Sequence, residues 1–127
     1  MLKAFTLVGI GGAVGSIGRF LVAQYVQSRF ATSHFPYGTL IVNITGCFII
    51  GVIFGIAAKT EIMAEWRLLL VTGICGGYTT FSAFSFESIS LLRTGNLLHF
   101  FIYVSASVVL GLLATLIPIM FFQKILG

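Results

Sequence analysis

Four apolar stretches, each long enough to cross a membrane, occupy most of this 127-residue chain. A helix needs ~20 consecutive, mostly apolar residues to span the hydrocarbon core of a bilayer. The composition agrees, because 58% hydrophobic and 8% charged residues leave too little polar surface to solvate a globular protein. We therefore predict an all-α integral membrane protein, in which residues 1–127 form a single four-helix transmembrane domain. The predicted spans are Ala4–Val26, Thr39–Ala58, Leu68–Leu92 and Leu97–Phe122.

The connections between these spans are short, so consecutive helices are expected to run antiparallel. The first span is expected to stay in the mature protein, because Arg19 and a glycine-rich interior are unlike a cleaved signal peptide. Basic residues are divided almost evenly between the two ends of the bundle. This count leaves open a single orientation or insertion both ways as an antiparallel homodimer. One end carries Lys3, Lys59, Arg67 and Lys124, and the other carries Arg19, Arg29 and Arg93.

The charged and nucleophilic side chains do not form a recognisable catalytic set. Acidic residues are limited to Glu61, Glu65 and Glu87, and the net charge of +4 is spread over loops and termini. No base, nucleophile and orienting group come together, and no Walker-type phosphate loop is present. We therefore expect neither an enzyme nor a nucleic-acid-binding protein. Cys47 and Cys75 lie at membrane depth and indicate no disulfide or metal pair.

The third span contains a segment that an ordinary lipid-facing helix would not need. Residues 73–84 read Gly-Ile-Cys-Gly-Gly-Tyr-Thr-Thr-Phe-Ser-Ala-Phe. Glycines free the backbone from helical geometry, and non-helical backbone at membrane depth is tolerated only inside protein or beside a water-filled cavity. We predict that the third helix is broken near Gly76–Thr79, and that the break forms an internal site that moves or holds an ion.

Polar side chains in the other spans also favour a functional interior. Tyr103, Ser107 and Thr115 share one face of the last helix with Gly111. Such hydroxyl groups either line a pathway or hold helices together, and their spacing alone does not separate the two. Arg19 likewise either snorkels to the interface or attracts an anion. Glycines that predict close helix packing recur at Gly11, Gly15 and Gly18 and at Gly46, Gly51 and Gly55.

Three motifs, in this order along the chain, resemble those of the Fluc (CrcB) family of fluoride channels. They are Gly-Gly-Ala-Val-Gly-Ser-Ile-Gly-Arg-Phe at 11–20, Gly-Thr-Leu-Ile-Val-Asn-Ile-Thr-Gly at 38–46 and Thr-Gly-Ile-Cys-Gly-Gly-Tyr-Thr-Thr-Phe-Ser-Ala-Phe-Ser-Phe-Glu at 72–87. The resemblance extends over essentially the whole chain. It implies an antiparallel, dual-topology homodimer in the bacterial inner (plasma) membrane. Such a dimer would let fluoride leave the cytoplasm passively through two pores and so confer fluoride resistance.

The resemblance also implies roles for individual residues. Phe81 and Phe84 resemble the phenylalanines whose ring edges line the fluoride path, and Asn43 resembles the asparagine that donates a hydrogen bond to the ion. The other pathway residues implied in this way are Ser82, Thr39, Tyr103, Ser107, Thr115, Arg19 and Glu87. Backbone carbonyl groups of Gly76 and Thr79 from both subunits would hold a structural sodium ion at the dimer centre. A hard cation suits carbonyl oxygens that are freed where a helix breaks.

Two positions depart from the family pattern. Ala83 stands where the family commonly has threonine, and Gly111 stands where a serine often belongs to the hydroxyl series of the last helix, so one donor is missing. Two rival functions are a proton-coupled exporter of the small multidrug-resistance kind and a scaffold without transport. The exporter needs a carboxylate in the first helix, and residues 4–26 contain none. A scaffold would leave Asn43 and the segment from Gly76 to Phe84 without a purpose.

Overall fold

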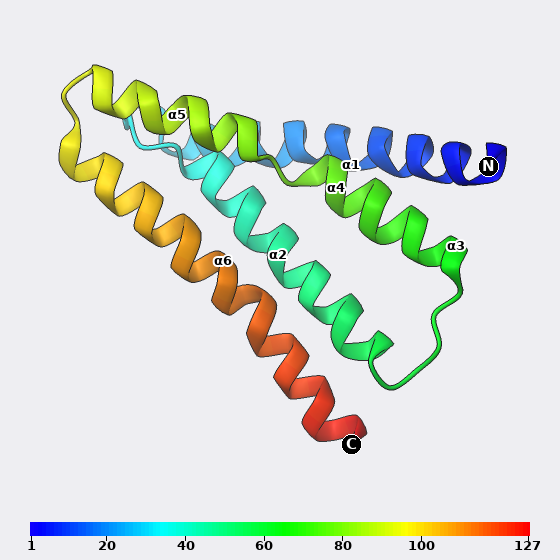
Figure 1. Ribbon diagram of the computed structural model, residues 1–127. Helices are drawn as coiled ribbons and strands as arrows, with labels where there is room; N and C mark the ends of the chain where they lie inside the picture. The colour runs from blue at the N-terminus through cyan, green and yellow to red at the C-terminus, as the bar shows by residue number, and fades with distance from the viewer.

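The computed structural model of this protein describes residues 1–127 and is entirely helical (Figure 1). Four helical stretches are long and apolar enough to cross a membrane, namely Leu2–Arg29, Tyr37–Ala57, Ala64–Arg93 and Leu97–Leu126. The predicted all-α fold with four spans is therefore confirmed, and the chain is a multi-pass membrane protein. In chain order the elements are α1 (Leu2–Arg29), α2 (Tyr37–Ala57), α3 (Ala64–Arg67), η1 (Leu68–Cys75), α4 (Gly76–Tyr78), α5 (Phe81–Arg93) and α6 (Leu97–Leu126).

The four spans alternate in direction. α1 and the third span, which runs from α3 to α5, lead away from the end that holds both termini, whereas α2 and α6 lead back toward it (Figure 1). At the terminal end, Lys3 Nζ lies 2.6 Å from Glu65 Oε1, so the start of α1 is paired with the start of the third span. At the far end, Gly95 turns the chain into α6 with a φ of 81°, a conformation that glycine adopts without strain.

The backbone of the third span changes character along its length. η1 is a π-helix, and α4 continues it as an α-helix through Gly76 and Gly77. Thr79 and Thr80 are then extended, with φ and ψ of −82° and 155° and of −147° and 118°, before α5 begins. The departure from helical geometry thus falls at Thr79 and Thr80, at the end of the predicted segment Gly76–Thr79, while Gly76 stays helical with φ −63° and ψ −39°. Gly77 is small for another reason, because a Cβ there would lie 2.6 Å from the Gly12 carbonyl oxygen.

Glycines allow α1 and α2 to approach neighbouring helices at backbone distance. A Cβ at Gly15 would overlap the Ile74 carbonyl group of η1, and a Cβ at Gly51 would overlap the backbone of Thr115 on α6. These contacts confirm the predicted packing role of the glycines. Backbone approaches of the same kind occur at Gly11, Gly38 and Gly55.

The main cluster of buried apolar side chains lies at the end that contains the connection of residues 30–36. It comprises Phe35, Leu40, Leu91 and Tyr103, of which Tyr103 is fully buried. The Phe35 and Tyr103 rings meet edge to face with centroids 5.6 Å apart, and the Tyr103 ring lies 5.3 Å from that of Phe84. A row of aromatic rings therefore connects the 30–36 segment with α5.

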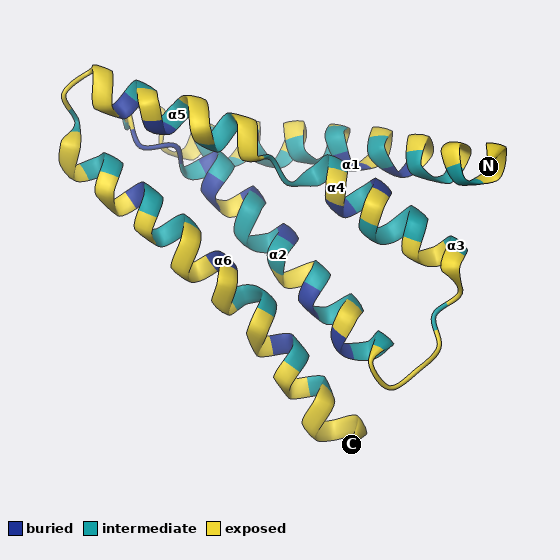
Figure 2. Ribbon diagram, viewed as in Figure 1, coloured by how far each residue is buried: buried dark blue, intermediate teal, exposed yellow.

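Buried residues lie where helices face one another and in the connection before α2, and most of the outer surface is exposed (Figure 2). The exposed side chains include large apolar ones such as Phe81, at 79% exposure, and Phe86, at 74%. A chain in water would bury such side chains against itself. Lipid or a second subunit is the environment that this surface fits.

Candidate functional site

The extended residues of the third span are held by an asparagine on α2. The Thr80 backbone N–H donates to Asn43 Oδ1 at 2.8 Å, and Asn43 Nδ2 donates to the Thr80 carbonyl oxygen at 3.0 Å. One side-chain amide therefore satisfies both backbone polar groups of a residue that has left helical geometry. Backbone groups at membrane depth need such partners because lipid offers none.

Thr79 and Thr80 also close the helices on either side of them. The backbone N–H and the hydroxyl of Thr79 both donate to the Cys75 carbonyl oxygen, at 3.0 and 2.9 Å, and so complete the end of α4. Thr80 Oγ1 accepts a hydrogen bond from the Ala83 backbone N–H at 3.1 Å, which makes Thr80 the N-cap of α5. The two threonines thus end one helix and begin the next.

This arrangement deprives two backbone carbonyl groups of their helical donors. In a continuous helix, Gly76 would accept from the Thr80 N–H and Thr79 would accept from the Ala83 N–H. The Thr80 N–H bonds instead to Asn43, and the Ala83 N–H bonds to the Thr80 hydroxyl. The carbonyl oxygens of Gly76 and Thr79 consequently accept no hydrogen bond within the chain.

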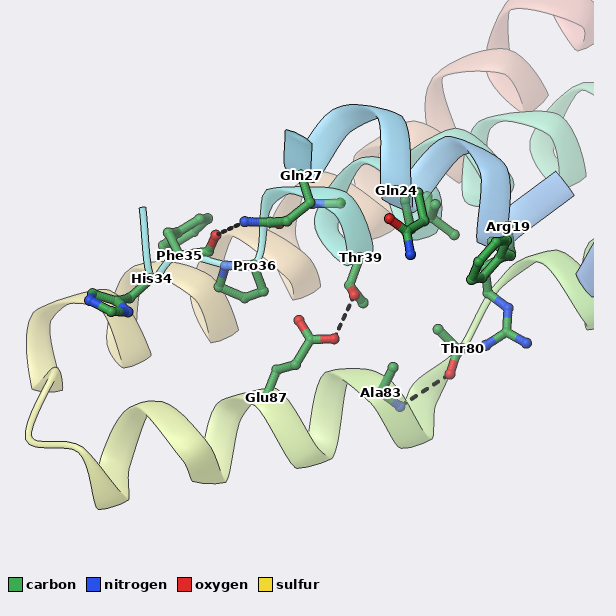
Figure 3. A pocket seen from close by; sticks show the side chains of 14 residues that line it. Arg19, Gln24, Gln27, His34, Phe35, Pro36, Thr39, Thr80, Ala83 and Glu87 are labelled. Carbon is green, nitrogen blue, oxygen red and sulfur yellow. Dashed lines mark hydrogen bonds between the residues drawn. The ribbon is translucent and has the colours of Figure 1, made fainter. Parts of the chain in front are cut away.

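A cavity of about 570 Å³ lies on one side of Thr80, between α1, α2 and α5 (Figure 3). Arg19 lies beside Thr80 in this view, and Glu87 lies farther along α5. Thr39 Oγ1 donates to Glu87 Oε1 at 2.6 Å. Arg19 forms no ion pair with Glu87, and its Nε atom is buried without a hydrogen-bond partner. The larger cavity therefore contains an unpaired cation and a carboxylate that bonds to a hydroxyl.

Gln27 holds the 30–36 connection against the start of α2. Its Nε2 donates to the Phe35 carbonyl oxygen at 3.3 Å, and its Oε1 accepts from the Gly38 backbone N–H at 3.1 Å (Figure 3). The Gly38 N–H belongs to the first turn of α2, where backbone donors lack helical partners. Gln27 thus supplies a cap from another helix and fixes the segment in which His34 and Phe35 line the larger cavity.

A second cavity, of about 300 Å³, lies between α2, α5 and α6 and shares Thr80 with the first. Its polar walls include Asn43, Thr80 and Ser107, and no charged residue lines it. The rings of Phe81 and Phe84 form another wall, with centroids 5.7 Å apart and planes tilted by 47°. The smaller cavity therefore combines aromatic rings with uncharged hydrogen-bonding groups.

The hydroxyl groups on α6 fall into two kinds. The hydroxyl oxygens of Tyr103 and Ser107 are buried and have no hydrogen-bond partner. Thr115 Oγ1 instead donates to the carbonyl oxygens of Cys47 and Gly111, at 3.1 and 3.2 Å. Because buried hydroxyl groups are normally bonded, the Ser107 hydroxyl, which lines the smaller cavity, is open to a ligand, whereas Thr115 joins α6 to α2.

The structure places the predicted pathway residues in two neighbouring groups. Seven of them line a cavity: Arg19, Thr39 and Glu87 the larger one, and Asn43, Phe81, Phe84 and Ser107 the smaller one. The other three line neither. Ser82 is exposed, with its hydroxyl 3.2 Å from that of Thr80. Tyr103 is buried behind Phe84, and Thr115 lies farther along α6.

The cavity-lining residues that are absent from the predicted set include Thr80, Gln27 and Cys47. Thr80 could have been found as an N-cap, because threonine is favoured immediately before a helix. Cys47 could have been found from its position one helical turn after Asn43. Gln27 gave no local signal, since its partners are a carbonyl group of the 30–36 connection and a backbone N–H of α2, both outside its own helix.

Comparison with known proteins supplies a family for this geometry. The family model described as CrcB-like protein, Camphor Resistance (CrcB), matches residues 6–119. A protein of Rhizobium johnstonii named fluoride-specific ion channel FluC is 50% identical over 117 residues, which cover 91% of this chain and 92% of the relative. A protein of the same name from Aquifex aeolicus is 48% identical, over 85% of this chain and 87% of the relative. Another, from Phocaeicola vulgatus, is 43% identical, over 93% of this chain and 97% of the relative.

Proposed function

The chain belongs to the CrcB family, and from this membership we propose that it is a fluoride-selective channel through which the anion leaves the bacterial cytoplasm passively. The family consists of channels, and the protein is not an enzyme. Residence in the inner (plasma) membrane and fluoride resistance of the host are part of the proposal. The observation that carries it is the pair of hydrogen bonds between the Asn43 side chain and the backbone of extended Thr80, here called the Asn43–Thr80 tie. Thr80 lines both a charged cavity and an aromatic one.

In the larger cavity, we assign the attraction of fluoride to Arg19. A cation in a concave, partly apolar site raises the local concentration of anions. The unpaired Nε of Arg19 supports this role, because no carboxylate neutralises the guanidinium group. Glu87 would repel an anion if its charge were bare, and the hydrogen bond from Thr39 at 2.6 Å offsets part of that charge.

In the smaller cavity, fluoride exchanges water for directed groups of the protein. Aromatic rings have a positive edge, so the edges of Phe81 and Phe84 replace part of the hydration shell. An amide nitrogen carries two hydrogens, and Asn43 uses one on the Thr80 carbonyl group, which leaves the other for the ion. The unpaired hydroxyl group of Ser107 extends this set of donors. A narrow path with donors placed for a small anion favours fluoride over chloride.

We propose that two chains form an antiparallel, dual-topology homodimer with two pores. Support comes from the even division of basic residues and from the exposure of Phe81 at membrane depth. A two-fold axis then produces two equal pathways. A Lys3→Cys variant in a cysteine-free background tests the topology: an impermeant thiol reagent should label about half of the molecules from one side of the membrane. Complete labelling from one side only would contradict it.

A structural sodium ion fits the residues that the family resemblance assigns to it. Oxygen ligands suit hard cations, and the carbonyl groups of Gly76 and Thr79 have lost their helical donors. Two carbonyl groups from each chain would hold the ion, whose charge would bridge the subunits. Sodium should therefore raise the thermal stability of the purified dimer relative to N-methylglucamine. Equal stability in both salts would argue against the site.

Fluoride efflux from liposomes tests the proposed function. The purified protein is reconstituted, a potassium diffusion potential is applied, and a fluoride electrode records release, with chloride as the parallel ion. Phe81→Ile removes a ring from the smaller cavity, and Phe86→Ile is its matched control, because Phe86 is an exposed phenylalanine of α5 that lines neither cavity. We expect rapid voltage-driven fluoride release, little chloride release, and loss of fluoride release in Phe81→Ile only.

Other outcomes distinguish the rival functions. Release that requires a proton gradient would contradict a passive channel and identify Glu87 as a coupling site. A folded dimer without any release would support a scaffold. Equal activity of Phe81→Ile and Phe86→Ile would remove the aromatic pair from the pathway while leaving fluoride conduction itself intact.

A further inference from the structure

Cys47 lies in the wall of the smaller cavity, although its sequence context suggests only apolar packing. It follows Asn43 by one turn of α2 and lines the cavity with Asn43, Phe84 and Ser107. It is partly exposed and forms no disulfide. The other cysteine, Cys75, is only 3% exposed and lines no cavity described above.

The Cys47 sulfur lies opposite the missing side chain of Gly111. A Cβ placed on Gly111 would be 3.6 Å from Cys47 Sγ, which is an ordinary van der Waals distance. The row on α6 that begins with Tyr103 and Ser107 therefore has no side chain at its next turn, and a thiol from α2 faces that position. Thr115, one turn later, directs its hydroxyl to backbone carbonyl groups of Cys47 and Gly111.

A second observation, independent of Cys47, points to a polar ligand in this cavity. The Ser107 Oγ atom, on the same cavity, is buried and has no hydrogen-bond partner. Buried hydroxyl groups normally have one, so the free donor indicates a ligand that the protein itself does not supply. A thiol beside it adds a weak S–H donor to a wall that otherwise resembles a small apolar surface.

We propose that the Cys47 thiol is an ion-contacting group of the pathway and takes the place of the side chain that Gly111 lacks. The inference rests on the proposed function, fluoride conduction, and adds a specific donor to it. The pathway then continues from Asn43 and Ser107 along the α2–α6 contact. Beyond Ser107 of α6, the next donor is Cys47 of α2. A thiol also makes this wall open to covalent modification.

Substitution and rescue test the thiol as a donor. Cys47→Ala should lower fluoride efflux about 3- to 10-fold, the effect expected for one modest hydrogen bond. Cys47→Ser keeps a donor and should stay within about twofold of the unmodified protein. Gly111→Ser places a hydroxyl group beside the vacated position, so Cys47→Ala with Gly111→Ser should recover the efflux. Cys47→Ala with Gly111→Ala fills part of the same space without a donor and should not recover the efflux; recovery in this variant as well would indicate a packing role alone and overturn the inference.

Covalent labelling tests the location of Cys47 independently. The reagent is methyl methanethiosulfonate. The Cys47 thiol gives its proton to the buffer, and the resulting thiolate attacks the sulfenyl sulfur of the reagent. A new S–S bond forms as the S–S bond of the reagent breaks and methanesulfinate leaves. Cys75→Ala retains Cys47 and should lose efflux when treated. Cys47→Ser retains only the buried Cys75, so its efflux should not change on treatment. Mass spectrometry of the intact protein measures labelling without reference to transport.

The unmodified protein in the same liposomes separates this inference from the proposed function. If it conducts and the inference holds, labelled Cys75→Ala no longer conducts fluoride, and Cys47→Ala with Gly111→Ser recovers the efflux lost in Cys47→Ala. If it conducts but labelled Cys75→Ala still conducts, or if Cys47 resists the reagent, the inference is overturned and the channel proposal stands. An unmodified protein that does not conduct overturns both.

Discussion

The two cavities beside Thr80 share a wall but differ in charge. The larger, of about 570 Å³, contains Arg19 and Glu87, whereas the smaller, of about 300 Å³, has aromatic rings, Asn43 and no charged residue. A charged space concentrates hydrated ions, and an uncharged one obliges an ion to exchange water for protein dipoles. If the proposed function holds, attraction and dehydration of the anion would therefore occur in separate places, with the Asn43–Thr80 hydrogen bonds at the boundary between them.

The largest expected effect comes from removing that boundary with Asn43→Asp. Aspartate still accepts from the Thr80 N–H but has no hydrogen to donate to the Thr80 carbonyl oxygen, and its charge repels an anion. Fluoride efflux from liposomes should fall about 100-fold, which corresponds to ~2.7 kcal/mol. Asn96→Asp, in the turn before α6, is the control and should keep its activity. Similar loss in both variants would mean that the tie has no special role.

Displacing the boundary by steric overlap should have the next largest effect. A Cβ at Gly46 would overlap the Thr79 side chain and lie 3.1 Å from Tyr78 Cδ1. Gly46→Val should lower the free energy of unfolding by ~1–3 kcal/mol, the cost of overpacking. Thermal unfolding in detergent measures it, and Gly9→Val is the control because a Cβ at Gly9 has no neighbour within 4 Å. Equal unfolding temperatures would place the Gly46 contact outside the energetically important packing.

A smaller effect is expected when only the cap of α5 is removed. Thr80→Ala loses the side-chain acceptor for the Ala83 N–H but keeps both backbone bonds to Asn43. Stability should fall by ~1 kcal/mol, and Thr80→Ser should retain most of it. Hydrogen exchange at the Ala83 amide measures the loss directly, since that amide should exchange faster only in Thr80→Ala. Unchanged exchange would show that the cap does not protect the helix.

The smallest effect is expected at the charged cavity and should depend on salt. Arg19→Gln should lower fluoride efflux about 2- to 5-fold at low ionic strength, and an impermeant salt should remove most of the difference by screening. Arg93→Gln is the matched control, because Arg93 is exposed and lines neither cavity. A difference that persists at high salt would assign Arg19 a direct contact with the ion in place of long-range attraction, and the contrast between the cavities would weaken.

The sequence was sufficient to predict the four spans and several residues that the structure places at the cavities, but not the exact geometry of the third span. Hydropathy identifies four spans because each must meet lipid over its whole length. The family motifs contain Asn43, Phe81 and Phe84, which the structure places around one cavity. In contrast, Gly77 is helical and small because Gly12 of α1 lies against it, and a local propensity for glycine to leave a helix does not include that neighbour.

The partner of Thr80 could not be predicted from the sequence either, because it too lies on another helix. Asn43 and Thr80 are 37 residues apart, and their pairing depends on how α2 packs against the third span. Sequence patterns describe one helix at a time, so they identified Asn43 as a polar residue at membrane depth without its partner. Thr80 itself has a local signature as an N-cap, and Gln27, whose partners lie in the 30–36 connection and in α2, has none.

The order of the tie along the chain has a consequence for biosynthesis. Asn43 leaves the ribosome 37 residues before Thr80, so α2 is already made when the extended residues of the third span emerge. A non-helical peptide that entered lipid alone would carry two unsatisfied backbone groups, and these would oppose insertion. Here the amide that receives them precedes them into the membrane. The earlier span thus acts as the template on which the irregular one is completed during synthesis.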